Sequence, residues 1–200
     1  MKRLLITASL AASAILPSAA HAQAIPGAVI AVVDLDKVTN ECTACKNAAT
    51  SLRSQATGFE NHRQALAAPL QTEGKSIQAA VDALNGKEPD ATLQARVRAF
   101  QAKQAQAEQE LAGQQQQIQR NNQYIQKQIA DKLGPIYTQV MQKRGANMLV
   151  EIGQTLASGA NLDVTGDVVT ALNAALPAIQ TTAPAAAAQQ AKPKSQPQGR

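Results

Sequence analysis

The residues best suited to chemistry in this sequence are two cysteines, Cys42 and Cys45, separated by two positions. In an oxidising compartment this spacing could form a short-range disulfide or take part in dithiol exchange. A thioredoxin-like role would need a surrounding βαβ unit, and haem attachment would need a histidine where Lys46 stands. Three interpretations remain: a structural disulfide, which we favour, free or intersubunit-linked thiols, and a functional redox or metal site.

The sequence lacks residues that other common catalytic and metal sites would need. His62 is the only histidine after residue 22, so a zinc site has no second pair of ligands and a hydrolase triad would depend on this residue alone. Asp34 and Asp36 could mimic an acid pair, but we expect them to cap a helix or to pair with Lys37. The sequence contains no glycine-rich phosphate-binding loop. We therefore predict a protein that is not an enzyme and that needs no cofactor and no metal.

The elements that would position these residues are short apolar segments at either end of a long polar middle. Residues 30–38 and 144–153 have high β-propensity, and residues 154–156 could add a short third strand. The intervening alanine, glutamine and lysine are typical of helix. Strand segments so far apart must meet in space, and the simplest route is a helix that runs out and back. The sequence thus predicts an α+β fold with a small β body and a long α-helical hairpin arm.

The middle segment carries an apolar stripe with a coiled-coil period on each side of a turn signal. The helical pattern starts near residues 39–40, and the turn formers at residues 85–90 mark the tip of the hairpin. Pro69 should bend or break the outgoing helix, and residues 134–135, Gly-Pro, should break the returning helix near the body. The stripe positions are Ala49, Leu52, Ala56, Phe59, Leu66, Leu70, Ile77 and Leu84 on the way out, then Leu93, Val97, Phe100, Ala107, Leu111, Ile118, Ile125, Ile129, Ile136 and Val140, with the polar interruptions Gln104, Gln114 and Asn121.

Both ends of the sequence depart from this pattern. Residues 1–22 combine a basic start, an apolar run and a small-residue cleavage site, which is the layout of a secretory signal peptide. Toward the other end, Thr165 is a suitable N-cap for a last helix that stops at Pro177. Residues 178–200 mix alanine, glutamine, proline and lysine without periodicity, so we expect a disordered tail.

Composition favours an extended or oligomeric molecule. The chain of 200 residues has two phenylalanines, two tyrosines and no tryptophan, and alanine supplies much of its apolar content. Aromatic side chains dominate the energetics of cores, so this chain could not fill a thick core alone. Export and the shortage of aromatics for base stacking also argue against nucleic acid as a partner.

Basic residues outnumber acidic ones between residues 91 and 145. One interpretation is a solvated helix face. The other is an electrostatic funnel for acidic clients, or for the anionic head groups of a membrane surface. The candidate client-facing basic residues are Arg96, Arg98, Lys103, Arg120 and Lys127.

The apolar segments also carry a family resemblance. IAVVDLDKV at residues 30–38 and RGANMLVEIG at residues 144–153, followed by LDVT and an alanine-leucine helix, resemble the OmpH-like (Skp) family of periplasmic chaperones. The resemblance covers about residues 27–177. It implies a homotrimer in which each subunit adds two to three strands to a pooled barrel, while the helical arms enclose a cavity. It further implies an ATP-independent periplasmic holdase for unfolded outer-membrane β-barrel proteins.

On this basis the chain divides into functional segments. They are a signal peptide at 1–22, a β-rich trimerisation body at 23–38 and 144–177, a helical hairpin arm at 39–143, and a tail at 178–200. Pooling strands across subunits would close the open edges of each small sheet. The candidates for the shared trimer core are Ile30, Val32, Leu149, Ile152 and Leu162. The alternative hypothesis is a structural coiled-coil adaptor of the envelope that docks on one fixed partner.

Overall fold

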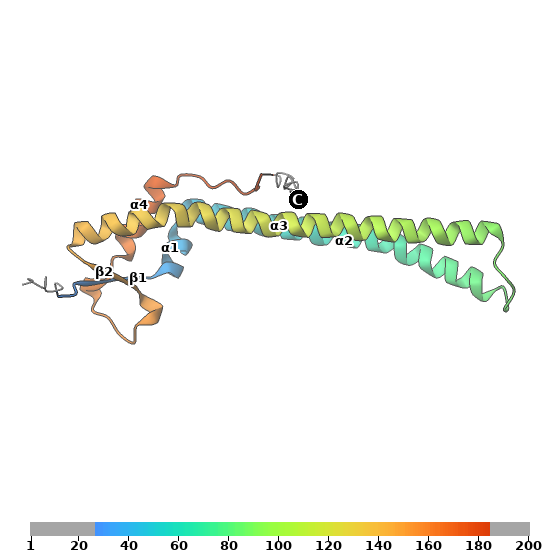
Figure 1. Ribbon diagram of the computed structural model, residues 1–200, viewed down its shortest axis with the longest axis horizontal. Helices are drawn as coiled ribbons and strands as arrows, with labels where there is room; N and C mark the ends of the chain where they lie inside the picture. The colour runs from blue at the N-terminus through green and yellow to red at the C-terminus, as the bar shows by residue number, and fades with distance from the viewer. Residues whose placement is uncertain (1–26, 185–200) are drawn as a thin grey trace, which may run out of the picture.

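A long two-helix arm projects from a small body that contains the strands (Figure 1). The computed structural model describes residues 27–184, so the expected signal peptide and residues 185–200 lie outside the described residues. The elements are β1 (Ile30–Val33), α1 (Leu35–Glu41), α2 (Thr43–Asp82), α3 (Ala91–Arg144), β2 (Met148–Glu151), the 3₁₀ helices η1 (Ile152–Gln154) and η2 (Ala160–Leu162), and α4 (Thr165–Ala175). The expected α+β class, with a small strand body and a long helical hairpin, is confirmed.

The two strands pair in parallel, and the entire arm connects them. The register places Ile30 opposite Met148 and Val33 opposite Glu151. The other edge of β1 is touched by a single bridge from Val32 to Asp163. The third strand expected at residues 154–156 is wrong, because the preceding residues curl into η1 instead of extending along the sheet.

The strand expected over residues 30–38 stops at Val33, and its second half is helical. The Oδ1 atom of Asp34 accepts a hydrogen bond from the Lys37 N–H at 2.8 Å, so Asp34 is the N-cap of α1. A capped helix start satisfies backbone donors that would otherwise lack partners, and here it outweighs the β-propensity of the following residues. Val38 is fully buried as a helical residue. The expectation that Asp34 caps a helix is confirmed.

The arm begins later than expected, at a second cap. The helical start predicted at residues 39–40 is wrong, because these residues lie inside α1 and the chain breaks at Cys42. The Sγ atom of Cys42 accepts a hydrogen bond from the Cys45 N–H at 3.2 Å and caps α2. A cysteine is an unusual N-cap, so the preference for Ser, Thr, Asp and Asn gives no warning of this boundary.

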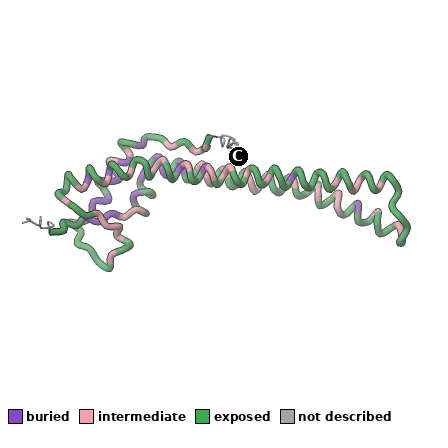
Figure 2. The backbone as a smooth tube through the Cα atoms, viewed as in Figure 1, coloured by how far each residue is buried: buried purple, intermediate pink, exposed green. Residues whose placement is uncertain are grey.

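The core of the molecule lies in the body, between β1, α1, α4 and the bases of α2 and α3. Figure 2 shows the buried residues concentrated there, whereas most of the distal arm is exposed. Val168 and Leu172 of α4 are fully buried against Ile136 and Val140 of α3. All four aromatic side chains are only half-buried. The core is therefore built from small aliphatic side chains.

Helix α4 starts one residue earlier than expected, at the residue predicted as its cap. Thr165 is the first helical residue, and Val164 occupies the N-cap position without a side-chain hydrogen bond. The Thr165 hydroxyl instead accepts a hydrogen bond from the Asp34 N–H at 2.9 Å. The expected N-cap at Thr165 is therefore wrong, although the helix does end before Pro177.

The seam between α2 and α3 follows the expected stripe, with two exceptions on α2. Every stripe residue expected on α3 is buried or half-buried, but Ala49 and Ala56 of α2 are exposed. Ala48 and Gln55 occupy the seam in their place. Alanine occurs on all faces of this arm, so its spacing carries little information about which face is covered.

Pro69 and Pro135 lie inside the continuous helices α2 and α3. The expected break at residues 134–135 is wrong. Ile136 and Val140, on the next turns, pack into the body core, and that burial outweighs the loss of one backbone hydrogen bond. In α2, by contrast, the helix turns away from α3 in its distal part (Figure 1), beside Pro69.

The connection between α2 and α3 is an exposed turn that includes residues 85–90. Asn85 and Gly86 adopt positive φ angles of 50° and 84°, a conformation that asparagine and glycine tolerate best. Asp90 then caps α3, because its Oδ1 atom accepts a hydrogen bond from the Leu93 N–H at 2.8 Å. No helix among residues 27–184 is long and apolar enough to cross a membrane.

The chain turns back after α4 and runs along the arm (Figure 1). Ile179 packs against the body core. Gln180, Thr181 and Ala183 form hydrogen bonds with side chains of α2 and α3. The expected disordered tail is therefore wrong for residues 178–184, and the rest of it lies outside the described residues.

Candidate functional site

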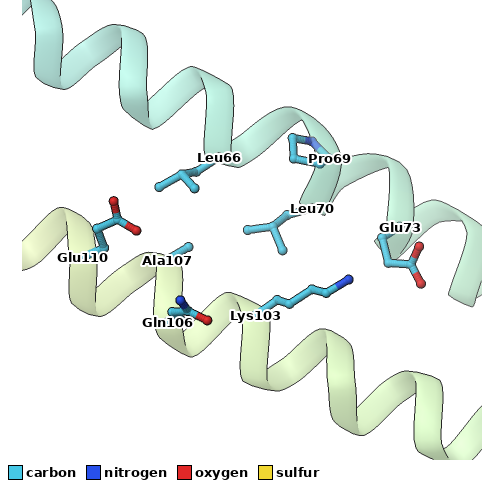
Figure 3. A pocket seen from close by; sticks show the side chains of 8 residues that line it. All are labelled: Leu66, Pro69, Leu70, Glu73, Lys103, Gln106, Ala107 and Glu110. Carbon is cyan, nitrogen blue, oxygen red and sulfur yellow. The ribbon is translucent and has the colours of Figure 1, made fainter.

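A cavity opens between the two arm helices at the point where α2 bends. Leu66 and Leu70 of α2 face Ala107 of α3 across a space of about 350 Å³ (Figure 3). Pro69 lies beside these leucines, and proline removes a helical hydrogen bond and pushes against the preceding turn. The cavity has an apolar floor and a charged rim, which suits an apolar side chain inserted from outside. Its lining residues are Leu66, Pro69, Leu70, Glu73, Lys103, Gln106, Ala107 and Glu110.

An ion pair on one side of this cavity and a histidine–carboxylate contact on the other link α2 to α3. On the tip side, the Nε atom of Arg96 donates to Glu73 Oε1 at 2.7 Å. The Arg96 guanidinium holds the pKa of the Glu73 carboxyl below its usual range. On the body side, His62 Nε2 lies 2.7 Å from Glu110 Oε1. Side chains thus link the two helices on the tip side and on the body side of the cavity, where the apolar packing between the helices is incomplete.

An aromatic ring of α3 packs against α2 at Gly74, next to Glu73 of the cavity lining. Gly74 lies against Phe100, so that a β-carbon on Gly74 would sit 3.2 Å from the ring. A side chain at this position would push the ring outward or the helices apart. The small residue at 74 therefore lets the Phe100 ring lie directly against α2.

The five candidate basic residues do not form one cluster. Arg96 is paired with Glu73, and Lys127 Nζ lies 2.8 Å from Asp131 Oδ2 on its own helix. The Arg120 guanidinium donates to the side chain of Gln117. Among the ion pairs of residues 27–184, none includes Arg98 or Lys103, the two remaining candidates. Two of the five candidate charges, those of Arg96 and Lys127, are thus paired with carboxylates of the same chain.

Cys42 and Cys45 are joined in a disulfide with a Cα–Cα distance of 5.1 Å. Cys42 is fully buried at the junction of α1 and α2, and Cys45 is 7% exposed. The sulfur atoms therefore lie inside the body core, where an external thiol has little access. In the described part of the chain, no group of three or more His, Cys, Asp or Glu side chains could hold a metal ion.

The candidate trimer-core residues differ in burial. Val32 is already buried within the chain, Leu149, Ile152 and Leu162 are half-buried, and Ile30 is 41% exposed. Other large apolar side chains of the body are also exposed, and sequence reasoning missed them: Val29, Met148 and Leu156. The strand register could have suggested Met148, because it lies directly opposite Ile30.

Amide side chains on the arm bind the returning segment after α4, and sequence reasoning missed this role. Gln117, Asn121 and Gln128 of α3 and Gln55 of α2 all contact residues 180–183. Asn121 stands out in the sequence as a polar interruption of the stripe, and it is 4% exposed in the structure. An asparagine at a position of the apolar stripe was the available sequence signal for a hydrogen-bonding role.

The comparison with sequence profiles of protein families identifies the family. The sequence profile described as outer membrane protein (OmpH-like) matches residues 29–172, which include both strands, the whole arm and most of α4. The chain belongs to the OmpH-like family. No curated protein matches it.

A solved structure shares the fold of this OmpH-like chain. It is the crystal structure of a candidate outer membrane chaperone (OmpH-like) from Caulobacter crescentus CB15, with a TM-score of 0.63 and 18% sequence identity. The alignment covers 78% of this chain and 89% of that chain. The similarity at this level of identity concerns the fold. The segment at residues 178–184 lies outside the residues that the family profile matches.

Proposed function

We propose that this protein is an ATP-independent holdase chaperone of the periplasm, which binds unfolded outer-membrane β-barrel proteins between the helical arms of a homotrimer. The observation that carries the proposal is the shape: a long hairpin, mostly exposed, that projects from a small body (Figure 2). Membership of the OmpH-like family supports a chaperone role. An arm of this kind offers many weak contacts to a client and releases it without chemistry.

The surface of the arm supports binding of an unfolded chain. Its exposed side chains are largely alanine, glutamine and lysine, which combine small apolar patches with hydrogen-bonding groups. The cavity at Leu66 and Leu70 adds a place for a larger apolar side chain. Such contacts give affinity by number rather than by one deep pocket.

The test is an aggregation assay without nucleotide. An outer-membrane β-barrel protein unfolded in urea is diluted into buffer, and light scattering follows its aggregation. We expect an equimolar amount of trimer to suppress scattering strongly. Adding ATP should not change the result. Unchanged aggregation at a several-fold excess of the protein would overturn the proposal.

A shortened arm is the matched control. Deleting residues 69–82 and 91–104 removes about two heptads from each helix, keeps the native tip, and leaves the body untouched. We expect this variant to retain the oligomeric mass of the full protein and to lose most of the suppression. If it protects the client as well as the full arm does, the distal arm has no part in holding the client.

Two further experiments distinguish the holdase from two other function classes. A coiled-coil adaptor would recover one envelope complex in a pull-down, whereas a holdase recovers many β-barrel proteins. A thiol oxidoreductase would lose its activity when Cys42 and Cys45 are replaced, whereas we expect the holdase activity of the Cys42→Ser, Cys45→Ala variant to be retained, since serine also serves as an N-cap.

A further inference from the structure

The returning segment after α4 is held by its backbone. The N–H of Gln180 donates to Gln128 Oε1 at 3.0 Å. The C=O of Gln180 accepts a hydrogen bond from Gln128 Nε2 at 2.9 Å. The N–H of Ala183 donates to Asn121 Oδ1 at 2.8 Å, and its C=O accepts from Gln117 Nε2 at 3.3 Å. Both backbone groups of two residues are therefore satisfied by side-chain amides, as a neighbouring β-strand would satisfy them.

A fourth amide extends this arrangement to the other helix. Gln55 of α2 donates from Nε2 to the carbonyl of Thr181 at 3.1 Å, and its Oε1 accepts from Asn121 Nδ2 at 2.7 Å. Asn121 also accepts from Gln117 at 2.7 Å. We call Gln55, Gln117, Asn121 and Gln128 the amide track. The first three orient one another through their side chains, and Gln128 Nε2 donates to the Tyr124 carbonyl at 3.2 Å on the same helix, so the track is built into the arm and does not depend on the segment alone.

The contacts that depend on side chains of the segment are fewer and weaker. Tyr124 approaches the Gln180 side chain at 3.4 Å, and Ser51 donates to the Thr181 hydroxyl at 3.0 Å. The segment is uncharged, and no ion pair holds it within the described residues. A site that reads backbone groups accepts any extended chain that brings free N–H and C=O groups to it.

A hydrogen-bond donor without an acceptor lies beside the amide track. Arg120 Nε is shielded from solvent and has no hydrogen-bond acceptor among the described residues, while another nitrogen of the same guanidinium donates to Gln117. A buried donor without an acceptor is costly. A chain that lies on the track with one more carbonyl in reach of Arg120 would be bound better than the resident segment.

We propose that the amide track is a binding site for an extended, unfolded client segment, and that residues 178–184 occupy it as a built-in competitor while the client is absent. This inference rests on the proposed holdase function and names where on the arm a client backbone binds. Unfolded β-barrel chains suit the site, because their strands have backbone groups that are not yet paired. The resident segment is joined to α4, so a client displaces it without its leaving the molecule.

The experiment compares two truncations of the full chain. Removing residues 185–200 leaves the resident segment in place, whereas removing residues 180–200 empties the track and keeps Ile179 in the core. Binding of a fluorescently labelled, urea-unfolded β-barrel protein is measured by anisotropy. We expect the second truncation to bind about fivefold more tightly, because a competitor that occupies the site most of the time lowers apparent affinity by the unoccupied fraction. The first truncation should bind like the full chain.

A substitution tests whether the client uses the same amides. In the background that lacks residues 180–200, we expect Gln128→Leu to weaken client binding several-fold. Tyr124→Phe is the matched control on the same helix face and should leave the affinity unchanged, because Tyr124 contacts only a side chain of the segment. Hydrogen exchange on the full chain gives an independent readout: the Gln180 and Ala183 amides should exchange faster when client is bound.

The outcomes are distinguishable. If the full chain and both truncations bind the client equally, and exchange at Gln180 and Ala183 does not change, the client does not use the amide track and the inference is overturned. If Gln128→Leu and Tyr124→Phe behave alike, the amide has no special role and the inference also fails. If no form of the protein binds the client, the proposed holdase function itself is wrong.

Discussion

Thr165 shows how a single side chain joins distant elements of the body. Its hydroxyl accepts a hydrogen bond from the Asp34 N–H at the end of β1. Its own N–H donates to Asp163 Oδ1 at 2.8 Å. The hydroxyl and N–H of Thr165 hold the pKa of the Asp163 carboxyl below its usual range. Thr165 is 1% exposed, so the junction of β1 with α4 is held by a buried, hydrogen-bonded side chain.

Asp167 connects α4 to the end of the arm. Arg144 Nε lies 2.6 Å from Asp167 Oδ2, and Lys143 Nζ lies 3.4 Å from Oδ1. The Arg144 guanidinium, and to a lesser degree Lys143, holds the pKa of Asp167 below its usual range. We expect Asp167→Asn to lower the free energy of unfolding by about 1 kcal/mol at pH 7, because the charged partners of the carboxylate are lost.

The pH dependence of this effect has a defined sign. A carboxyl whose pKa is lower in the folded state stabilises the fold above its unfolded pKa, and this contribution disappears as the pH falls through the folded pKa. The difference between the native protein and Asp167→Asn should therefore be full at pH 7 and shrink below about pH 4. Urea denaturation followed by circular dichroism measures it. Asp131→Asn, which removes an exposed pair within α3, is the control and should change stability little. A difference that is the same at pH 7 and pH 3 would contradict the role of the charge.

At the scale of elements, apolar spacing predicts the arm but not its boundaries. The α3 stripe is correct because Leu, Ile, Val and Phe at heptad positions occur on one face only. The start of α1 and the break at Cys42 depend on which side-chain atom meets a free N–H, and local propensity does not contain that information. The placement of residues 178–184 depends on amides from two helices, so it has no periodic signature.

The roles of the candidate site residues could be predicted from the sequence less well than the arm. Sequence charge selected Arg96, but its acidic partner Glu73 lies on the other helix of the hairpin. Pairing across the hairpin depends on how the two helices line up, which composition does not specify. The exposed face of the body was only partly anticipated for a similar reason: Ile30 was selected, whereas Met148 becomes its neighbour through the parallel register.

Pro69 sets the local separation of the arm helices. Proline in a helix interior costs about 3 kcal/mol relative to alanine, although part of this cost is relieved by bending. We expect Pro69→Ala to raise the free energy of unfolding by about 1–2 kcal/mol. It should also bring α2 closer to α3 and narrow the cavity at Leu66 and Leu70. Dipolar EPR between spin labels at Gln71→Cys and Gln104→Cys measures the distance, since the native cysteines are paired.

Pro135→Ala is the matched control for the bend. This proline is also an exposed residue inside a continuous helix, but the turns that follow it are fixed by the body core. It should raise stability by a similar amount and leave the label distance unchanged. A label distance that responds equally to both substitutions, or to neither, would show that Pro69 does not separate the helices.

At the scale of the whole molecule, the body exposes apolar surface that a single chain leaves uncovered. Val29, Ile30 and Met148 are 51%, 41% and 47% exposed, and Leu156 is fully exposed. These residues lie on or next to the two strands and on the loop that follows β2. The sheet of the described residues has two strands, and while β1 is bridged to Asp163 on its outer side, no strand pairs with the outer edge of β2. Association of bodies would cover both the apolar side chains and the edges.

For the proposed homotrimer, we expect light scattering to give three times the mass of one chain. Acidic substitutions on the exposed apolar surface of the body should dissociate the trimer. Ile30→Glu combined with Met148→Glu places two carboxylates at register-paired positions, where burial in an interface would leave them without partners. This variant should fall to the mass of one chain while its helical circular dichroism is retained. Val81→Glu is the matched control, since Val81 is equally exposed at 40% but lies near the tip of the arm. If the body variant keeps the trimeric mass, the subunits associate through another surface, and a client cavity defined by three arms on one shared body would have to be built differently.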